Sequence, residues 1–246
     1  MLPVLPLGPL ALPTRPLLLL LGIGWGLAAV EREARRRGLP PGTSDAVGWG
    51  LLVGFVVARA AAEIPMGIAS PGDLLRLLRP DLNPLALGPG LLIAALVLGL
   101  GWRRRKVPLL AGLDALSPLI LIPRIAVALG DWAEGRGYGE PTAWPWLGML
   151  GGGGRHPVQL YEAVLGLVAL GLWHGGRQGP WAPGGAFLLA LALAGGVGLF
   201  VEGLRADVPT WMGFRLPQVA AFALTLLSLF GLSRRALPPD QAPPGR

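Results

Sequence analysis

Seven long apolar segments divide this chain, and they limit the possible folds more than any other feature of the sequence. They lie at roughly 16–30, 45–64, 85–102, 108–129, 157–174, 181–202 and 214–232. A helix needs about 20 apolar residues to cross a bilayer, and each segment is near that length. No convincing cleavage site follows the first segment, so we expect it to remain as a helix rather than to be removed as a signal peptide. The pattern predicts an all-α integral membrane protein with about seven transmembrane helices.

The composition agrees with a membrane protein and excludes several other classes. Hydrophobic residues make up 52% of the chain and charged residues only 14%, against about 25% charged in soluble domains. The net charge of +7 comes from short arginine clusters between apolar segments, so no nucleic-acid partner is expected. The chain has no cysteine, which excludes a disulfide, a zinc–thiolate site and a cysteine nucleophile.

The basic residues predict how the chain crosses the membrane. Dense clusters fall in alternate connections: Arg32, Arg35, Arg36 and Arg37; Arg103, Arg104, Arg105 and Lys106; Arg177; Arg234, Arg235 and Arg246. The other side holds seven basic residues against these twelve, spread thinly among acids. Because cytoplasmic connections are enriched in Lys and Arg, we expect the N-terminus outside and the C-terminus in the cytoplasm. We expect one transmembrane domain over residues 1–235 and a disordered, proline-rich cytoplasmic tail over residues 236–246.

A polar cluster, Arg155–Glu162, opens directly onto the apolar helix expected from Val158 to about Trp173. Pro157 suits the first helical position, and Gln159 and Glu162 are three residues apart, on one face of the first turns. The helix dipole favours a carboxylate there. An imidazole, an amide, a phenol and a carboxylate would therefore gather at one helix mouth. The same residues also fit a plain polar cap on a membrane helix.

Ionisable residues inside the apolar segments are candidates for function, because such residues are costly in lipid. They are Arg59, Glu63, Arg124, Glu202 and Arg205. The alternative is a structural ion pair or a side chain that reaches the membrane surface. We favour the structural interpretation for Glu63 and the functional one for Arg124 and Glu202. Glu202 and Arg205 are three residues apart and are expected to pair.

The chain resembles the bacterial prolipoprotein diacylglyceryl transferases over nearly its whole length. Residues 156–162 (HPVQLYE) resemble the family's HP-x-Q-LYE motif, and residues 201–207 (VEGLRAD) resemble its VE-x-x-R-x-x-D stretch. Residues 130–139 resemble its glycine-rich signature loop, residues 7–12 resemble its opening, and Arg59 falls on its second-helix arginine. The resemblance implies transfer of diacylglyceryl from phosphatidylglycerol to the lipobox cysteine of prolipoproteins.

The resemblance also implies a site, a location and partners. The implied catalytic residues are His156, Glu202, Arg124 and Glu134; the implied substrate-binding residues are Arg59, Asp131, Gly139, Gln159, Tyr161, Glu162 and Arg205. The arginines at 124, 59 and 205 would hold the phosphate, and His156 or one of the glutamates at 134, 162 and 202 would accept the thiol proton. The expected location is the bacterial inner membrane, with the active side facing outward. Phosphatidylglycerol, prolipoprotein signal peptides and the lipid bilayer are the expected partners of a monomer, with no cofactor or metal.

Several positions differ from the family pattern. Gly88–Gly90 (GPG) stands where the family has HGG, and two family arginines fall on Ala128 and Gly198. The signature's asparagines fall on Asp131 and Glu134, and its glutamate falls on Arg136. Arg124 lies one helical turn before Ala128 and projects from the same face, so we hypothesise that it supplies the missing cation.

Two alternatives to an active transferase stay open at this point. A non-catalytic relative would keep the fold and bind phospholipid or a membrane partner, which the missing histidine and arginines favour. A small transporter ranks last, because the chain lacks the repeat symmetry and broken helices of many transporters.

Overall fold

The computed structural model describes residues 3–7, 10–63, 85–144, 153–206 and 208–236, and these form helices with two short hairpins. The predicted tail lies almost entirely outside the described residues. The chain divides into two compact units, which we describe separately. Unit 1 comprises residues 1–26 and 113–246, and unit 2 comprises residues 27–112. The prediction of a single domain over 1–235 is not tested by this division.

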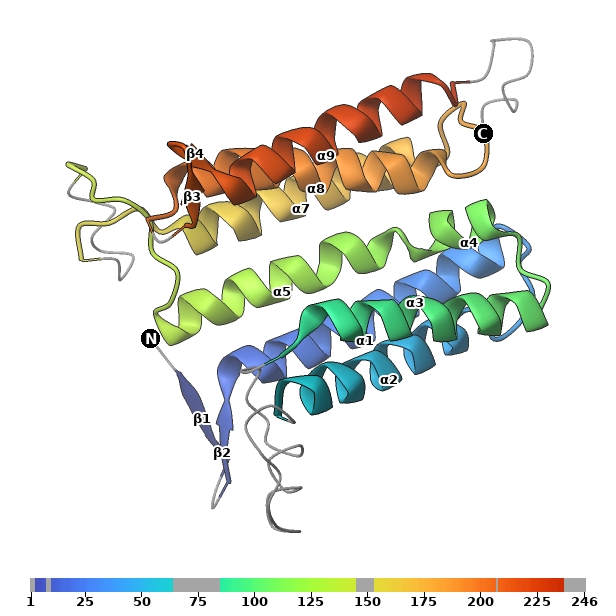
Figure 1. Ribbon diagram of the computed structural model, residues 1–246, viewed down its shortest axis with the longest axis horizontal. Helices are drawn as coiled ribbons and strands as arrows, with labels where there is room; N and C mark the ends of the chain where they lie inside the picture. The colour runs from blue at the N-terminus through green and yellow to red at the C-terminus, as the bar shows by residue number, and fades with distance from the viewer. Residues whose placement is uncertain (1–2, 8–9, 64–84, 145–152, 207, 237–246) are drawn as a thin grey trace. The chain divides into compact units, whose positions relative to one another are not determined.

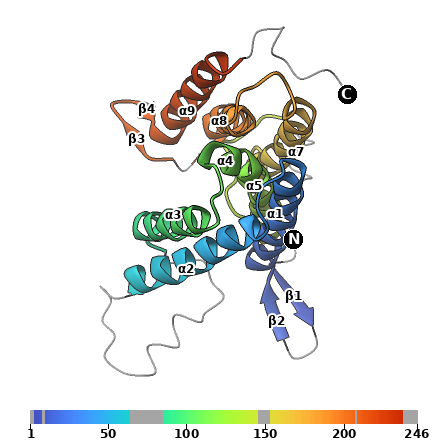
Figure 2. The same ribbon diagram turned by 90° about the vertical axis from the view of Figure 1, so that its right-hand side faces the viewer.

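Unit 1 is built around four helices that pack side by side in chain order (Figures 1 and 2). Helix α7 (Val158–Gly176) packs between α5 (Pro118–Glu134) and α8 (Gly185–Leu204), and α9 (Leu216–Ser233) packs along α8. The core consists of Leu121, Val158, Ala169, Trp173, Ala190, Ala194, Val197 and Val201. Hairpin β1 (Val4–Leu7)–β2 (Leu10–Pro13) precedes α1 (Thr14–Arg36), and hairpin β3 (Thr210–Trp211)–β4 (Phe214–Arg215) precedes α9.

Glycines bring the helices of unit 1 close together. A Cβ at Gly166 of α7 would lie 2.7 Å from Ile125 of α5, and one at Gly195 of α8 would lie 2.5 Å from Thr225 of α9. Small residues at such crossings let membrane helices approach and gain packing that lipid cannot supply.

Unit 2 contains the second part of α1 with α2 (Thr43–Glu63) and α3 (Leu87–Arg104). Helices α2 and α3 pack through small residues, because a Cβ at Gly54 would lie 2.7 Å from that of Ala94. Trp102 Nε1 donates to Thr43 O at 3.3 Å, which ties the end of α3 to the start of α2.

The membrane prediction is confirmed at the level of fold class. Six spans in the described part are long and apolar enough to cross a bilayer: Thr43–Glu63, Leu87–Arg104, Leu109–Glu134, Val158–Gly176, Gly185–Leu204 and Leu216–Ser233. The segment predicted at 16–30 lies within α1, which is not one of these six, so its crossing remains a prediction, as does the orientation of the termini.

The structure refines one local prediction and corrects another. The segment predicted at 108–129 is two helices, α4 (Leu109–Leu116) and α5, separated at Ser117, and α5 continues to Glu134, where Gly135 ends it at φ 71°. Pro157 precedes α7 as its N-cap residue instead of occupying the first helical position. Glu162 therefore lies beyond the first turn of α7, where arginines rather than the helix dipole stabilise its charge.

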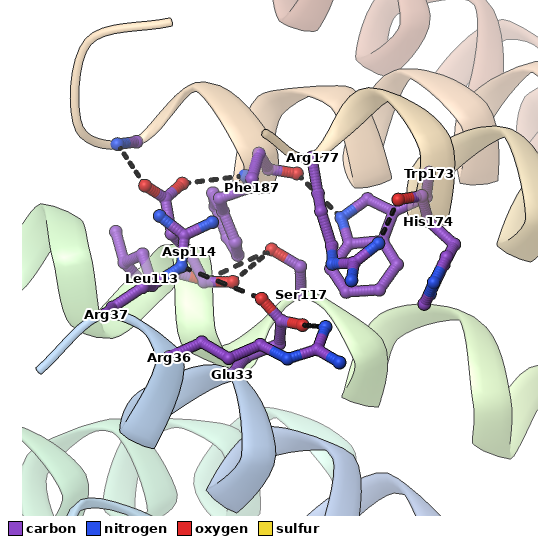
Figure 3. Close-up of polar contacts among 12 residues, drawn as sticks. Glu33, Arg36, Arg37, Leu113, Asp114, Ser117, Trp173, His174, Arg177 and Phe187 are labelled. Atoms are coloured by element: carbon purple, nitrogen blue, oxygen red, sulfur yellow. Dashed lines mark hydrogen bonds and ion pairs between the residues drawn. The ribbon is translucent and has the colours of Figure 1, made fainter. Parts of the chain in front are cut away.

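A buried carboxylate that our sequence reasoning missed fixes the start of α8 (Figure 3). Asp114 of α4 is 2% exposed, and its two oxygens accept hydrogen bonds from Gly184 N at 2.8 Å and Phe187 N at 3.0 Å. The first N–H groups of a helix have no partner within the helix, so Asp114 caps α8 from another helix. An acid inside the apolar run 109–129 was the available signal.

Replacing Asp114 by Ala is expected to destabilise the protein by about 1–3 kcal/mol, because buried N–H groups at the start of α8 would lose their acceptor. Thermal unfolding in detergent measures this effect. Asp45→Ala, which removes an exposed acid from the first turn of α2, is the matched control and should unfold almost as the parent does. Equal unfolding temperatures for the two variants would contradict the proposed cap.

Candidate active site

Glu162, near the start of α7, lies between two arginines of unit 1. Arg124 Nε on α5 contacts its Oε1 at 2.7 Å, and Arg205 Nη2 at the end of α8 contacts its Oε2 at 3.0 Å. The Glu162 side chain is only 13% exposed, and the two arginine side chains are 31% and 25% exposed. One carboxylate from α7 therefore bridges two guanidinium groups from neighbouring helices, which is an anion site filled by the protein's own side chain.

Arg124 lies well inside the span Leu109–Glu134. Besides Glu162, it donates through Nη1 to Ala194 O of α8 at 2.9 Å. Gly198 of α8 leaves room for its guanidinium, because a Cβ at that position would lie 3.3 Å from Arg124 Nη2. A charged side chain within a span is costly unless it is paired, and these contacts provide its partners.

The predicted pairing of Glu202 with Arg205 is confirmed, with Arg205 Nε 3.4 Å from Glu202 Oε1. Arg205 thus contacts two carboxylates, one on its own helix and one on α7. Of these two contacts, the one to Glu162 is the closer. Arg205 therefore links Glu202 to Glu162.

A short extended segment, residues 139–142, ties the mouths of α7 and α8 together. Gly139 N donates to His156 O at 2.9 Å, His156 N donates to Glu140 O at 3.0 Å, and Glu140 N donates to Leu204 O at 2.9 Å. A Cβ at Gly139 would collide with Leu204 O and with the side chain of Val158. Gly139, predicted as a site residue, therefore permits the close backbone approach that holds this mouth together.

The other residues of the 156–162 motif contact loop groups or each other. His156 Nδ1 lies 3.2 Å from the Tyr161 hydroxyl. Gln159 is 2% exposed and donates through Nε2 to Arg136 O, which joins α7 to the connection after α5. Burial raises the pKa of Tyr138 in that connection, so its phenol is neutral at physiological pH.

Two predicted acids contact Arg15, at the start of α1 in unit 1. Arg15 Nε lies 2.5 Å from Asp131 Oδ1, and Arg15 N donates to Glu134 Oε1 at 3.1 Å. The other oxygen of Glu134 lies 3.1 Å from Arg136 Nε. Both carboxylate oxygens of Glu134 therefore have a partner, and one of them caps the N–H of Arg15 at the start of α1.

Arg59 lies in unit 2, where it is 1% exposed and its Nη2 is 3.5 Å from Glu63 Oε1. This contact agrees with the structural interpretation of Glu63. The predicted role of Arg59 in substrate binding stays a prediction. Among the described residues, no group of three or more acidic or histidine side chains is placed to hold a metal ion.

Our sequence reasoning missed a second ion pair at the mouth. Arg215 of β4 places Nη2 2.9 Å from Glu140 Oε1 and donates through Nη1 to Arg205 O and Glu202 O. The contact joins hairpin β3–β4 to residues 139–142 and to the end of α8. The only signal for this pair in the sequence was that Glu140 and Arg215 lie in two connections predicted on the same side of the membrane.

Comparison with known proteins supports the resemblance. The sequence profile named prolipoprotein diacylglyceryl transferase matches residues 3–234. The chain belongs to this family. Family membership together with the apolar helices indicates a multi-pass protein of the bacterial inner membrane.

Individual relatives agree with the family profile. Phosphatidylglycerol–prolipoprotein diacylglyceryl transferase 2 of Streptomyces coelicolor is 30% identical over 231 residues, which cover 87% of this chain and 72% of the relative. The transferase of Synechococcus elongatus is 24% identical, covering 92% of this chain and 84% of the relative. A Streptococcus pyogenes transferase is 25% identical, covering 93% and 92%. At these identities the chain is a divergent member of the family.

Proposed function

We propose that this protein transfers the diacylglyceryl group of phosphatidylglycerol to the lipobox cysteine of prolipoproteins. Its family and the names of its relatives support this activity. The structural observation that carries it is the convergence of Arg124 and Arg205 on one carboxylate. Such a pair of cations at the end of a membrane-embedded bundle suits a lipid phosphate.

The reaction breaks the bond between a glycerol carbon of the diacylglyceryl group and a phosphate oxygen. The acceptor sulfur forms a thioether with that carbon, and the departing glycerol phosphate keeps the electron pair of the broken C–O bond. The thiol must first lose its proton, since the thiolate is the nucleophile. Catalysis therefore requires aimed positive charge at the phosphate and a proton acceptor near the thiol.

Arg124 and Arg205 supply the positive charge in this proposal. Glu162 holds the position between their guanidinium groups in the structure. When phosphatidylglycerol binds, a phosphate oxygen takes over these contacts, because guanidinium groups bind phosphate as well as carboxylate in a forked geometry. Glu202 keeps Arg205 oriented through the contact at 3.4 Å.

The position of Arg124 supports the hypothesis that it supplies a missing cation, and it suggests that the same side chain also stands in for a second family arginine. The family's arginines fall on Ala128, one turn along α5, and on Gly198 of α8. The Arg124 guanidinium lies beside Gly198, where a side chain at that position would begin. Arg124 thus brings its charge to the space that an arginine at position 198 of α8, as in the family pattern, would occupy.

His156 is the proton acceptor in this proposal. Glu134, Glu162 and Glu202 are each already engaged in an ion pair with an arginine. His156 instead contacts the neutral hydroxyl of Tyr161. An imidazole also has an ordinary pKa close to physiological pH, which suits proton transfer from a thiol.

The remaining predicted residues shape the site. Gly139 and Gln159 hold the mouth of α7 to the adjoining connections, and Asp131 fixes Arg15 at the entrance. We place this mouth on the outer face of the membrane, since the dense basic clusters fall in the opposite connections. The substrate-binding role of Arg59, which lies in unit 2, is proposed from the family resemblance alone, and so is a monomeric state.

Transfer by purified protein in phosphatidylglycerol-containing micelles tests this function. A lipobox peptide serves as acceptor, and mass spectrometry reads the gain of one diacylglyceryl group. A peptide with Ser in place of the cysteine is the control. Phospholipid binding without transfer would instead support a non-catalytic relative.

A further inference from the structure

The turn of hairpin β3–β4 exposes large apolar side chains next to the candidate site. Trp211, Met212 and Phe214 are 63%, 79% and 64% exposed. We call these three residues, with Gly213, the hairpin tip. A soluble surface rarely groups such side chains at a turn, so an apolar tip of this kind indicates an interaction surface.

The backbone conformation of the tip also indicates an interaction surface. Met212 and Gly213 have φ angles of 49° and 82°, as in the two-residue hairpin turns that favour Asn-Gly or Asp-Gly. A side chain other than Gly at such a φ is sterically unfavourable, and the short polar residues tolerate it best. This turn nevertheless places a long apolar side chain at its most exposed point.

The base of the hairpin is held to the site by polar contacts. Thr210 pairs with Arg215 and Trp211 pairs with Phe214 in the strand register. Arg215 contacts Glu140 at 2.9 Å and donates to the Arg205 carbonyl. Within the described part of the chain, these polar contacts hold the base of the hairpin, while the exposed apolar side chains lie at its tip.

Hairpin β3–β4 leads directly into α9 (Figure 1), which is one of the six apolar spans of the described residues. Leu216, Val219 and Phe222 are 44%, 47% and 49% exposed, and their spacing of three places them on one side of the helix. In a membrane protein such a face contacts lipid. The tip extends this lipid-facing surface past the end of the helix.

We propose that the hairpin tip inserts into the membrane interface at the start of α9 and anchors the mouth of the site there. Trp suits this depth because its ring is apolar while its N–H reaches the headgroups. Insertion by about 5–10 Å is typical of interfacial segments. Through Arg215, the inserted tip fixes Glu140 and the end of α8 at the level of lipid headgroups. This role does not depend on the proposed transfer reaction.

Because the chain has no cysteine, Met212→Cys creates a single labelling site for an environment-sensitive fluorophore. The labelled full-length protein is placed in phosphatidylglycerol–phosphatidylcholine nanodiscs. Lipids with a spin label near the headgroup or deep in the acyl chain test contact with the bilayer, and iodide tests contact with water. Lys106→Cys, in an exposed basic cluster, is the matched control.

We expect the shallow spin label to quench the fluorophore at position 212 more than the deep one, with little quenching by iodide. At position 106 we expect the opposite result, with strong quenching by iodide and little quenching by either spin label. Phe214→Cys should repeat the pattern of position 212, which provides a second test if Met212→Cys does not fold. Strong quenching of position 212 by iodide would overturn the proposal. Protection of position 212 from iodide and from both spin labels would also overturn it. Protection from iodide that appears only when a signal peptide is added would assign the tip to the acceptor and also overturn it.

Discussion

Arg124→Ala is expected to slow diacylglyceryl transfer by roughly a hundredfold to a thousandfold, the usual effect of removing one aimed donor from developing negative charge. Arg124 is the cation that contacts Glu162 from within a span. Arg124→Lys keeps the charge but loses the forked geometry, so its rate should fall between those of the parent protein and of Arg124→Ala. The initial rate per folded protein in micelles measures the effect.

A second-site change makes this prediction more specific. Since Gly198 lies beside the Arg124 guanidinium, Gly198→Arg in the Arg124→Ala background returns a cation to the vacated space. We expect this double variant to recover part of the lost rate. Arg32→Ala, at an exposed position on α1, should leave the rate unchanged. An Arg124→Ala protein with the parent's rate would remove Arg124 from the mechanism.

Glu162→Gln is expected to strengthen binding of phosphatidylglycerol about tenfold. The amide keeps the shape of the side chain but removes the negative charge that occupies the anion position. A hydrogen bond to a charged group contributes about 1.5–3 kcal/mol, and the amide keeps part of each contact, so we expect a gain near the low end of that range, which is about tenfold. Binding of a fluorescent phosphatidylglycerol to protein in nanodiscs measures the change.

Two comparisons separate this effect from a general change in the site. Binding of phosphatidylcholine should rise less, since the quaternary ammonium of its headgroup cancels part of the gain. Glu202→Gln should have a smaller effect, because its contact with Arg205 is longer, at 3.4 Å. Weaker phosphatidylglycerol binding by Glu162→Gln would show that the carboxylate belongs to the binding site and does not compete for it.

Local sequence patterns were sufficient for the fold class and for part of the site. Apolar runs of spanning length predicted the helices, because burial in lipid requires about 20 such residues whatever they pack against. The i, i+3 spacing of Glu202 and Arg205 predicted their contact, which depends only on helix geometry. The motif at 156–162 identified the helix mouth correctly.

Contacts between distant segments could not be read from these patterns. Glu162 meets Arg124 and Arg205, which are 38 and 43 residues away in sequence. Asp114 caps a helix start 70 residues later, and Arg215 pairs with a residue 75 positions before it. Such pairings depend on how α5, α7 and α8 pack, which periodicity does not specify. The central position of Glu162 was therefore visible only in the structure.

Whether this chain catalyses transfer at all is the central question for its function. The deciding measurement is the mass of a lipobox peptide incubated with the purified protein and phosphatidylglycerol, beside an active family enzyme. We predict a gain of one diacylglyceryl group on the cysteine peptide and none on its serine counterpart. An unchanged cysteine peptide, with folded protein and a working reference enzyme in the same assay, would contradict the proposed activity.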